Sequence, residues 1–340
     1  MISFSFCSKK NVKKLMRFLG KNWEKNYILS KNLKLIDWQH LSKKNKYNFI
    51  IATLNGKIIG CLGFISHSHF SKKLKSNDTL WLVNWMVIKK TSVSGLEFIN
   101  FITKKINFKR IGSVGGNYTT QTILKKLGFK IGNLNHYFLI NPKINNFKLI
   151  SFPSNLKKIS KLELENRKLK LLRKKLHFGI FGKNTNKLVK KFGKDQTYFI
   201  NRYLNHPYYK YKIYLIYSYN KVLGFFVTRI CKFKKRKALR IIDFFGYDKA
   251  LIKIANPLRK LITSINAEYV DFYEHGINNS IMSKTGLLKN KFDNTTVVPN
   301  HFEPFEKKNI NLGWALRSTN SFKTRIFKGD CDQDRPSILS

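Results

Sequence analysis

The sequence predicts a mixed α/β protein made of two copies of one domain in tandem. Its 340 residues are too many for one typical domain and fit two, and 43% of them are hydrophobic, which is enough for a core in each half. A hairpin pattern occurs twice, and the same order of strand, helix, strand and short helix follows each occurrence. A duplication explains this better than coincidence does.

The two hairpins share their turn and their spacing. Residues 47–65 hold two apolar, strand-like runs around Asn55-Gly56, a dipeptide that tolerates positive φ and favours a tight turn. Residues 211–228 hold two more runs, with the bend predicted at 219–221. In both copies Lys precedes two aliphatic residues and a glycine, and these glycines, Gly60 and Gly224, are 164 residues apart.

The elements after each hairpin follow one order. Strands are predicted at 80–89 and 239–245, helices at 95–105 and 250–265, and further strands at 110–114 and 269–273. Short helices then end at Gly128 and Gly286, which are 158 residues apart. Two landmarks thus give nearly the same period.

Three segments are predicted along the chain. The first domain covers residues 1–145, the second covers 146–325, and an acidic tail covers 326–340. The joint is placed at 141–153, a stretch with two prolines and several asparagines. Residues 156–176, rich in Lys, Leu and Glu, are predicted to form a helix that braces the two halves.

Residues 117–129 carry the most specific motif, in which Asn117 opens a helix that Gly128-Phe129 closes. An asparagine at this place caps a helix, and a glycine supplies the positive φ that ends one. The motif resembles the late motif of the GNAT acyltransferase superfamily. The resemblance implies two tandem GNAT-like domains, each a mixed, mostly antiparallel sheet flanked by helices, and acyl transfer from acetyl-CoA or another acyl-CoA.

The resemblance also implies a loop whose backbone N–H groups bind the pyrophosphate of coenzyme A, before the helix at 95–105. Lys90 takes the basic opening position and Gly95 the closing one. The usual pair of glycines is missing, and residues 245–250 of the second half depart further, so activity of one half, of both or of neither stays open. The predicted cofactor-binding residues are Val87, Lys90, Thr91, Ser92, Val93, Ser94, Gly95 and Asn117.

Carboxylates are scarce in this chain, so their positions are informative. Asp243 lies inside an apolar strand, where it is either catalytic or buried against Arg240, Arg229 or a backbone amide. Counting back from the two helix-ending glycines places His275 at the position of Asn117. His275 is therefore a candidate acid or base that Glu274 orients.

The other polar candidates have structural alternatives. Tyr273 is a candidate acid for the leaving thiolate. His67 and His69 lack an apparent third metal ligand, so an exposed strand end is preferred to a metal site. Asp330, Asp332 and Asp334 alternate near the C-terminus without the Gly and Glu of a calcium loop. They form an acidic turn against the basic body or over the cleft, or a tail neutralised by lysines.

The charge balance is strongly basic, with 66 Lys and Arg against 18 Asp and Glu and a formal net charge of +48. Biased composition is the preferred explanation, and an anionic partner is the other. The four cysteines are far apart, no secretory signal or membrane span is evident, and peripheral membrane contact stays open, so a cytoplasmic protein with reduced thiols is predicted.

Three functions fit these observations. The preferred one is a coenzyme A-dependent N- or O-acyltransferase for a small acceptor, such as a sugar for surface-polysaccharide synthesis. The alternatives are a Fem-like aminoacyl transferase that uses charged tRNA, and a non-catalytic tandem domain that binds nucleic acid or another anionic partner.

Overall fold

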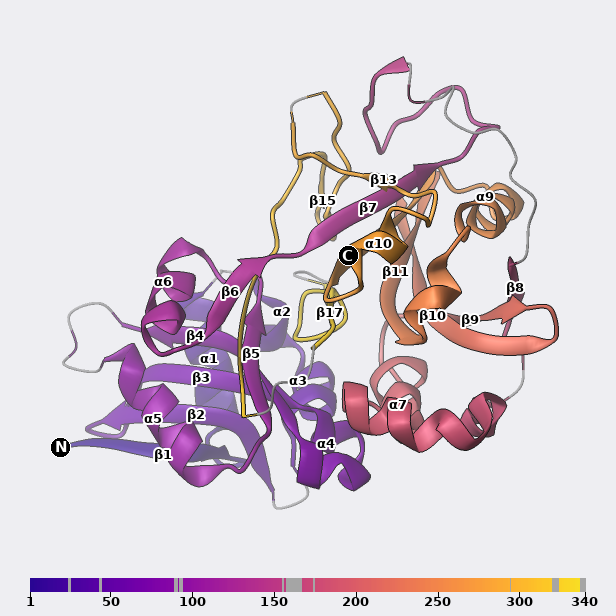
Figure 1. Cartoon of the computed structure of the whole chain (residues 1–340). Coiled ribbons are helices and arrows are strands. Elements are labelled where there is room, and N and C mark those ends of the chain that lie inside the picture. The colour runs from indigo at the N-terminus through magenta and orange to yellow at the C-terminus, as the bar shows by residue number, and fades with distance from the viewer. Residues whose placement is uncertain are drawn as a thin grey trace.

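The computed structural model describes residues 1–23, 26–42, 45–88, 91, 94–154, 156, 167–173, 175–293, 295–319 and 324–336. Figure 1 shows two sheets side by side, the first mostly indigo and magenta and the second mostly orange, with the yellow C-terminal segment between them. A hydrophobic core built from both halves lies there as well. In these ranges no helix is long and apolar enough to cross a membrane.

The first sheet has seven strands in the order β1-β2-β3-β4-β5-β16-β6. All neighbours are antiparallel except β4 and β5, which run parallel. Their bounds are β1 Ile2–Ser8, β2 Lys46–Leu54, β3 Lys57–Ser66, β4 Thr79–Val87, β5 Arg110–Val114, β6 Lys130–Asn133 and β16 Gly313–Ser318.

Helices cover both faces of this sheet because its strand residues alternate in direction. Phe49 and Ile51 pack against α1 Val12–Asn22, α2 Ile28–Lys31 and α3 Leu33–His40. Ile50 and Ala52 pack against α5 Gly95–Lys105 and α6 Tyr118–Lys126 on the opposite face. The helix predicted at 95–105 and the strand predicted at 110–114 are confirmed at both ends.

The second sheet follows the order β13-β7-β12-β11-β10-β9-β8, and β17 pairs with β12. Here β11 and β12 are the parallel pair. The strands are β7 Asn135–Ile140, β8 Arg167–Leu171, β9 Tyr211–Ser218, β10 Lys221–Phe233, β11 Arg236–Gly246, β12 Tyr269–His275, β13 Leu288–Lys289 and β17 Ile326–Phe327. A separate hairpin joins β14 His301–Phe302 to β15 Phe305–Glu306.

The remaining helices are short. The helix α9 Ala255–Ser264 packs on one face of the second sheet, and α10 Asn279–Met282 follows β12. The helices α7 Thr185–Phe192 and α8 Gln196–Phe199, with the π-helical turn Ile200–Leu204, contribute to the core between the halves. The helix α4 His67–Phe70 follows β3.

The predicted duplication is confirmed. The order β2-β3-β4-α5-β5-α6 recurs as β9-β10-β11-α9-β12-α10, and each copy has one parallel pair at the same place. After each second parallel strand the chain turns through a glycine with positive φ, Gly115 at 82° and Gly276 at 92°. Glycine adopts this conformation without the steric cost that other residues meet.

The two sheets exchange strands across the predicted boundary at residue 145. The strand β7 comes from the first segment but lies in the second sheet, beside β12. The strand β16 comes from the second segment but lies in the first sheet, between β5 and β6. Each sheet is therefore completed by a strand from beyond this boundary.

The helix predicted at 156–176 is wrong over residues 167–171, which form the edge strand β8 and pair with β9. Lys and Leu are good helix formers, but the open edge of β9 offers a complete ladder of backbone hydrogen bonds. Leu169 packs against the core under α9. Residues 157–166 lie outside the described residues.

The prediction of an exposed strand end at His67 and His69 is also wrong. His67 is buried, with its Nδ1 2.8 Å from the carbonyl oxygen of Gly193 and its Nε2 3.0 Å from Trp81 Nε1. A carbonyl only accepts and an indole N–H only donates, so the proton of this imidazole is on Nδ1. His67 thus connects the first sheet to the segment after α7.

Candidate active site

Each half contains a gap between its two parallel strands. The strands β4 and β5 pair only at their beginnings, up to Trp81 and Gly112, and β11 and β12 pair only up to Ile241 and Phe272. Both β4 and β11 carry a bulge just beyond the last paired residue, and Asn84 in the first bulge has a φ of 49°. A bulge bends its strand and removes residues from the ladder, which opens the gap.

One C-terminal segment, residues 326–335, lies between the two sheets and contacts the strands that border both gaps (Figure 1). In the second half, β17 pairs with β12, and the N–H of Gly329 donates to Ile242 of β11 at 2.8 Å. In the first half only side chains reach the strands. The Cys331 thiol lies 3.4 Å from the carbonyl oxygen of Leu82, and Gln333 Nε2 donates to the Val114 carbonyl at 3.0 Å.

The three aspartates of this segment are buried and not a solvent-exposed tail. Asp330 pairs with Lys194 at 2.8 Å, Asp334 with Arg229 at 2.9 Å and Asp332 with the neighbouring Arg335 at 2.9 Å. The predicted neutralisation by cations therefore occurs inside the protein, between the two halves.

Asp243 belongs to the same buried cluster. Its Oδ2 accepts hydrogen bonds from Lys194 and from the hydroxyl of Tyr203, both at 2.7 Å. Its ionic partner is thus Lys194 and neither Arg240 nor Arg229, whereas the predicted bond to a backbone amide is present, since Oδ1 accepts from the N–H of Phe244 at 2.8 Å. Burial raises the pKa of Asp243, whereas Lys194 and His67 hold the pKa of Asp330 below its ordinary value although burial alone would raise it. Lys194 is thus the shared counter-ion of both carboxylates.

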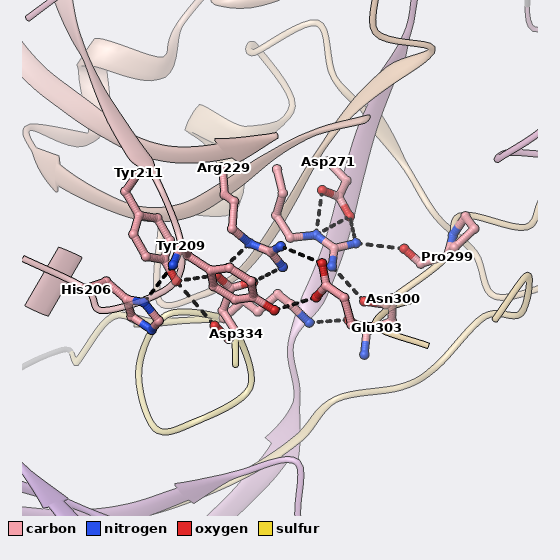
Figure 2. A network of polar contacts seen from close by, with 11 residues as sticks. His206, Tyr209, Tyr211, Arg229, Asp271, Pro299, Asn300, Glu303 and Asp334 are labelled. Atoms are coloured by element: carbon pink, nitrogen blue, oxygen red, sulfur yellow. Dashed lines mark hydrogen bonds and ion pairs between the residues drawn. The ribbon is translucent and has the colours of Figure 1, made fainter. Parts of the chain in front are cut away.

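A second polar network lies beside the first, and Figure 2 shows it from close by. Arg229 contacts Asp334 on one side and Glu303 on the other, and its guanidinium lies 3.8 Å from the ring centre of Tyr209. Burial alone would raise the pKa of Asp334, but Arg229 holds it below the ordinary value.

Arg240 and Asp271 form the adjacent pair in Figure 2. Arg240 Nη2 lies 2.7 Å from Asp271 Oδ2, and Nη1 and Nη2 donate to the carbonyl oxygens of Asn300 and Pro299. These contacts fix the loop 299–303 against the second sheet.

A cavity of about 650 Å³ lies between the halves and includes the predicted residue His275 in its wall. The imidazole of His275 faces the Trp314 indole with ring centres 4.1 Å apart, and burial lowers its pKa, so it is neutral at pH 7. The other lining residues come from β6, β7, β16, α10 and their connections: Gly128, Lys130, Asn135, Gly276, Ile277, Asn278, Asn279, Leu316, Arg317, Ser318 and Thr324.

Glu274 lies under the wall of this cavity and is fully buried. Its carboxylate accepts from Asn135 Nδ2 at 3.0 Å and from the N–H of Ile277 at 3.2 Å, and both donor residues line the cavity. Glu274 therefore orients Asn135 and the turn at 277. It does not orient His275 as predicted, because successive strand residues point to opposite faces of the sheet. Burial raises the pKa of Glu274 from 4.5 to about 7.

Glu274→Gln is expected to be more stable than the wild type at pH 8.5 by about 2–3 kcal/mol, and equally stable below pH 4.5. Between pH 4.5 and 7 the unfolded state loses a proton that the native state keeps, so wild-type stability falls as the pH rises through this window. Urea unfolding at pH 4.5 and 8.5 measures the difference. Glu306→Gln, at a half-exposed carboxylate, is the control and should change little. An equal effect of Glu274→Gln at both pH values would contradict the assignment.

Tyr273 is fully buried, and its ring stacks on His136 at 3.8 Å between centres. Its hydroxyl donates to the Ile310 carbonyl at 3.4 Å. Protonation of a thiolate by Tyr273 stays a prediction.

The predicted equivalence of His275 and Asn117 is wrong. Asn117 caps α6 by accepting from the N–H of Thr120, and in the second half Asn278 caps α10 by accepting from Ser280. The glycines with positive φ before the caps, Gly115 and Gly276, give the same alignment. Counting from the helix ends failed because α10 has four residues and α6 has nine.

The predicted cofactor loop is only partly described, since Lys90, Ser92 and Val93 lie outside the described residues. Val87 ends β4, and Thr91 Oγ1 donates to the Ile88 carbonyl. Ser94 caps α5, and the carboxylate of Glu97 accepts from the Ser94 N–H at 2.7 Å. A methyl group on Gly95 would lie 2.8 Å from the Trp85 ring, so this position has no room for a side chain.

The N-terminal ends of α5 and α9 differ in accessibility. At α5, Ser94, Leu96 and Glu97 are exposed. At α9 the first residues are buried, and the N–H groups of Lys253 and Ala255 donate to the carbonyls of Lys284 and Thr285. Backbone donors at the start of a helix attract anions, and only the start of α5 is accessible from solvent, where the Ser94–Glu97 capping box covers it.

Sequence reasoning missed Lys194 and Trp314, and it named Arg229 only as a candidate partner of Asp243 and not of Asp334. The two cations are single residues among 66 Lys and Arg, and nothing local distinguishes them. Trp314 follows a glycine in a short apolar run, which signals a strand but not the sheet to which the strand belongs.

The sequence matches no protein-family model and no curated protein. The structure is similar to two crystal structures. A GCN5-related N-acetyltransferase from Anabaena variabilis ATCC 29413 has a TM-score of 0.55 at 13% identity, over 94% of this chain and 73% of that one. A GCN5-related N-acetyltransferase from Kribbella flavida has a TM-score of 0.50 at 10% identity, over 94% of this chain and 71% of that one. The chain therefore has the tandem GNAT fold that the motifs predicted.

Proposed function

Since the chain has the tandem GNAT fold, we propose that it transfers an acyl group from coenzyme A to the amino group of a small acceptor. The donor binds to the first half, with its pyrophosphate at the start of α5 and its thioester in the gap between β4 and β5. The observation that carries this proposal is the exposed end of α5 beside this gap. The exposed residues Asn117 and Tyr118 at the start of α6 lie on the same face of the sheet.

The second half supports this assignment by contrast. Its gap is filled by backbone, since β17 pairs with β12 and Gly329 bonds to Ile242. The start of α9 is satisfied by carbonyl groups. We therefore assign the second half a supporting role, in which it supplies one wall of the acceptor site.

Bound acyl-CoA supplies an activated carbonyl group. The bulge of β4 between Val83 and Met86 frees backbone N–H groups beside the gap, and such donors stabilise negative charge on the carbonyl oxygen during attack. His275, neutral at pH 7, accepts the proton of the attacking amine, and as the amide bond forms the C–S bond breaks and the coenzyme A thiolate leaves and takes a proton from solvent. Glu274 positions Asn135 and the turn after His275.

The acceptor site is the 650 Å³ cavity, whose wall includes β16, the strand next to β5. Trp314 forms a wall of the cavity, and its strand neighbour Val114 lies at the gap. An indole face, several amide and hydroxyl groups and the cations Lys130 and Arg317 suit a polyhydroxylated ring with an anionic group. The class of acceptor that we propose is a phosphorylated or nucleotide-linked amino sugar.

Calorimetric titration with acetyl-CoA in 150 mM salt tests donor binding, and this salt suppresses unspecific attraction to the basic surface. Glu97→Gln is expected to bind acetyl-CoA about two- to fivefold more tightly, because the carboxylate competes with the pyrophosphate for the same N–H groups. Gly95→Leu is expected to weaken binding about tenfold, because the new side chain displaces Trp85 and the start of α5. Glu306→Gln, a carboxylate in the second half, is the matched control and should change nothing.

Two further results decide the proposal. Release of free coenzyme A should be faster with glucosamine 6-phosphate than with glucosamine, because only the former satisfies both the cations and the base. Binding that ignores both α5 variants and disappears at higher salt would instead support a non-catalytic protein that attracts polyanions. The filled gap of the second half is consistent with that alternative, whereas the tRNA-dependent alternative loses part of its proposed helical arm to β8.

A further inference from the structure

Arg110 is buried without a counter-ion. It begins β5 and is 2% exposed, and its Nε and Nη1 have no hydrogen-bond partner among the described residues. Among the described residues, its guanidinium donates one hydrogen bond, from Nη2 to the carbonyl oxygen of Lys191 in α7 at 3.4 Å. Guanidinium carries five N–H donors and stays protonated, so most of its hydrogen-bonding capacity is unused.

A second orphaned polar group lies beside it. Thr79 is the strand neighbour of Arg110, and its Oγ1 also has no partner in the described part of the chain. Strand alternation places Thr79 on the same face of the sheet as Trp81, toward the core between the halves. Arg110 lies on this face as well, because Ile111 packs against α5 and α6 on the other.

The other buried arginines have the hydrogen-bond or ionic partners that Arg110 lacks among the described residues. Arg229, Arg240 and Arg325 each pair with an aspartate. Arg202 has no carboxylate but donates to the carbonyl groups of Gly329 and Cys331.

The carboxylate nearest in sequence to Thr79 is already saturated. Asp78 accepts from the hydroxyls of Ser66 and Ser68 and from the N–H groups of Ser68 and Thr79. A buried charge without compensation costs several kcal/mol, and this chain has few carboxylates to spare for its cations.

We propose that Arg110 and Thr79 bind a small inorganic anion, chloride or phosphate, between the first sheet and α7. The anion supplies the missing counter-charge, and the hydroxyl of Thr79 donates a further hydrogen bond to it. Lys109 and the two lysines at the end of α7, with the net charge of +48, raise the local concentration of anions. This site is independent of the proposed acyl transfer.

The proposal is tested by thermal unfolding of the full chain in sodium gluconate, chloride and phosphate at equal ionic strength. Gluconate is the reference, because this largest of the three anions is expected not to enter the site. Wild-type Tm should be about 4 °C higher in the binding salt when that anion is near a hundred times its Kd. Arg110→Met should lose this increment, whereas Arg17→Met, which removes an exposed arginine of α1, should keep it. An effect of chloride without one of phosphate identifies a halide site, and the reverse identifies an oxyanion site.

Thr79→Val should raise the Kd for the anion about fivefold and so reduce the Tm increment. This variant tests the site if Arg110→Met does not fold. Equilibrium dialysis with labelled phosphate should find a bound ion that acetyl-CoA does not displace, if the site takes oxyanions. An anion increment that survives in Arg110→Met, or a wild type that responds equally to all three salts, overturns the proposal.

Discussion

Lys194→Met is expected to destabilise the protein by about 3–5 kcal/mol at pH 7, the magnitude typical of removing one partner from a buried ion pair. Lys194 holds Asp243 at 2.7 Å and Asp330 at 2.8 Å, and all three side chains are buried. Without the ammonium group the two carboxylates face each other in a medium of low polarity, so their pKa values rise. Urea unfolding measures the loss.

The pH dependence of the stability loss shows whether Lys194 contributes charge or packing. Because the carboxylates of the variant bind protons more tightly in the native state than in the unfolded one, the variant should lose stability as the pH rises above about 4 and regain part of it in acid. Asp243→Asn in the Lys194→Met background should restore part of the loss, because one buried charge is then gone. Lys187→Met, an exposed lysine on α7, is the control. A loss that is independent of pH would indicate that packing, not charge, is what Lys194 contributes.

Removing residues 326–340 is expected to abolish cooperative folding. The described part of this segment pairs with β12, reaches the carbonyls of Leu82 and Val114, and supplies the carboxylates for Lys194 and Arg229. Its loss would leave two buried cations with fewer carboxylate partners and would remove the contacts that the segment makes at both gaps. The summed loss of free energy should exceed the 5–15 kcal/mol that stabilises most proteins. Circular dichroism and calorimetry on the truncated chain measure this.

A synthetic peptide of residues 324–340, added in trans, should restore a cooperative transition to the truncated protein. A peptide in which the three aspartates are asparagines is the matched control and should not do so. A truncated protein that unfolds at the wild-type temperature would show that the segment only lies against the halves and does not hold them together.

The two halves have the same fold but different uses of it. In the first half the gap between the parallel strands meets only side chains of the C-terminal segment, and the adjacent helix start is exposed. In the second half the gap takes a strand, and the helix start is bonded to the carbonyls of Lys284 and Thr285, just after α10. Duplication thus supplied two equal frameworks, and short local changes closed one of them.

Local sequence located the repeated elements well. The predicted range 95–105 matches α5, and Asn117 and Gly128 mark both ends of α6 as predicted. Such signals act over a few residues, because caps and turns use neighbouring backbone groups. The same local method failed for residues 167–171, where the neighbouring edge of β9 decided the outcome.

The sequence by itself determined the duplication, the mixed α/β class and the limits of some repeated elements such as α5, β5 and α6, since periodicity and turn chemistry depend on neighbours in the chain. Only the tertiary structure decided that β7 completes the second sheet and β16 the first. It also decided that the aspartates near the C-terminus pair with Lys194 and Arg229. Which residue pairs with a buried charge or a strand edge depends on contacts between segments far apart in the sequence, and these form only when long loops close. Among 66 cations, no local pattern marks the few that burial will force into pairs.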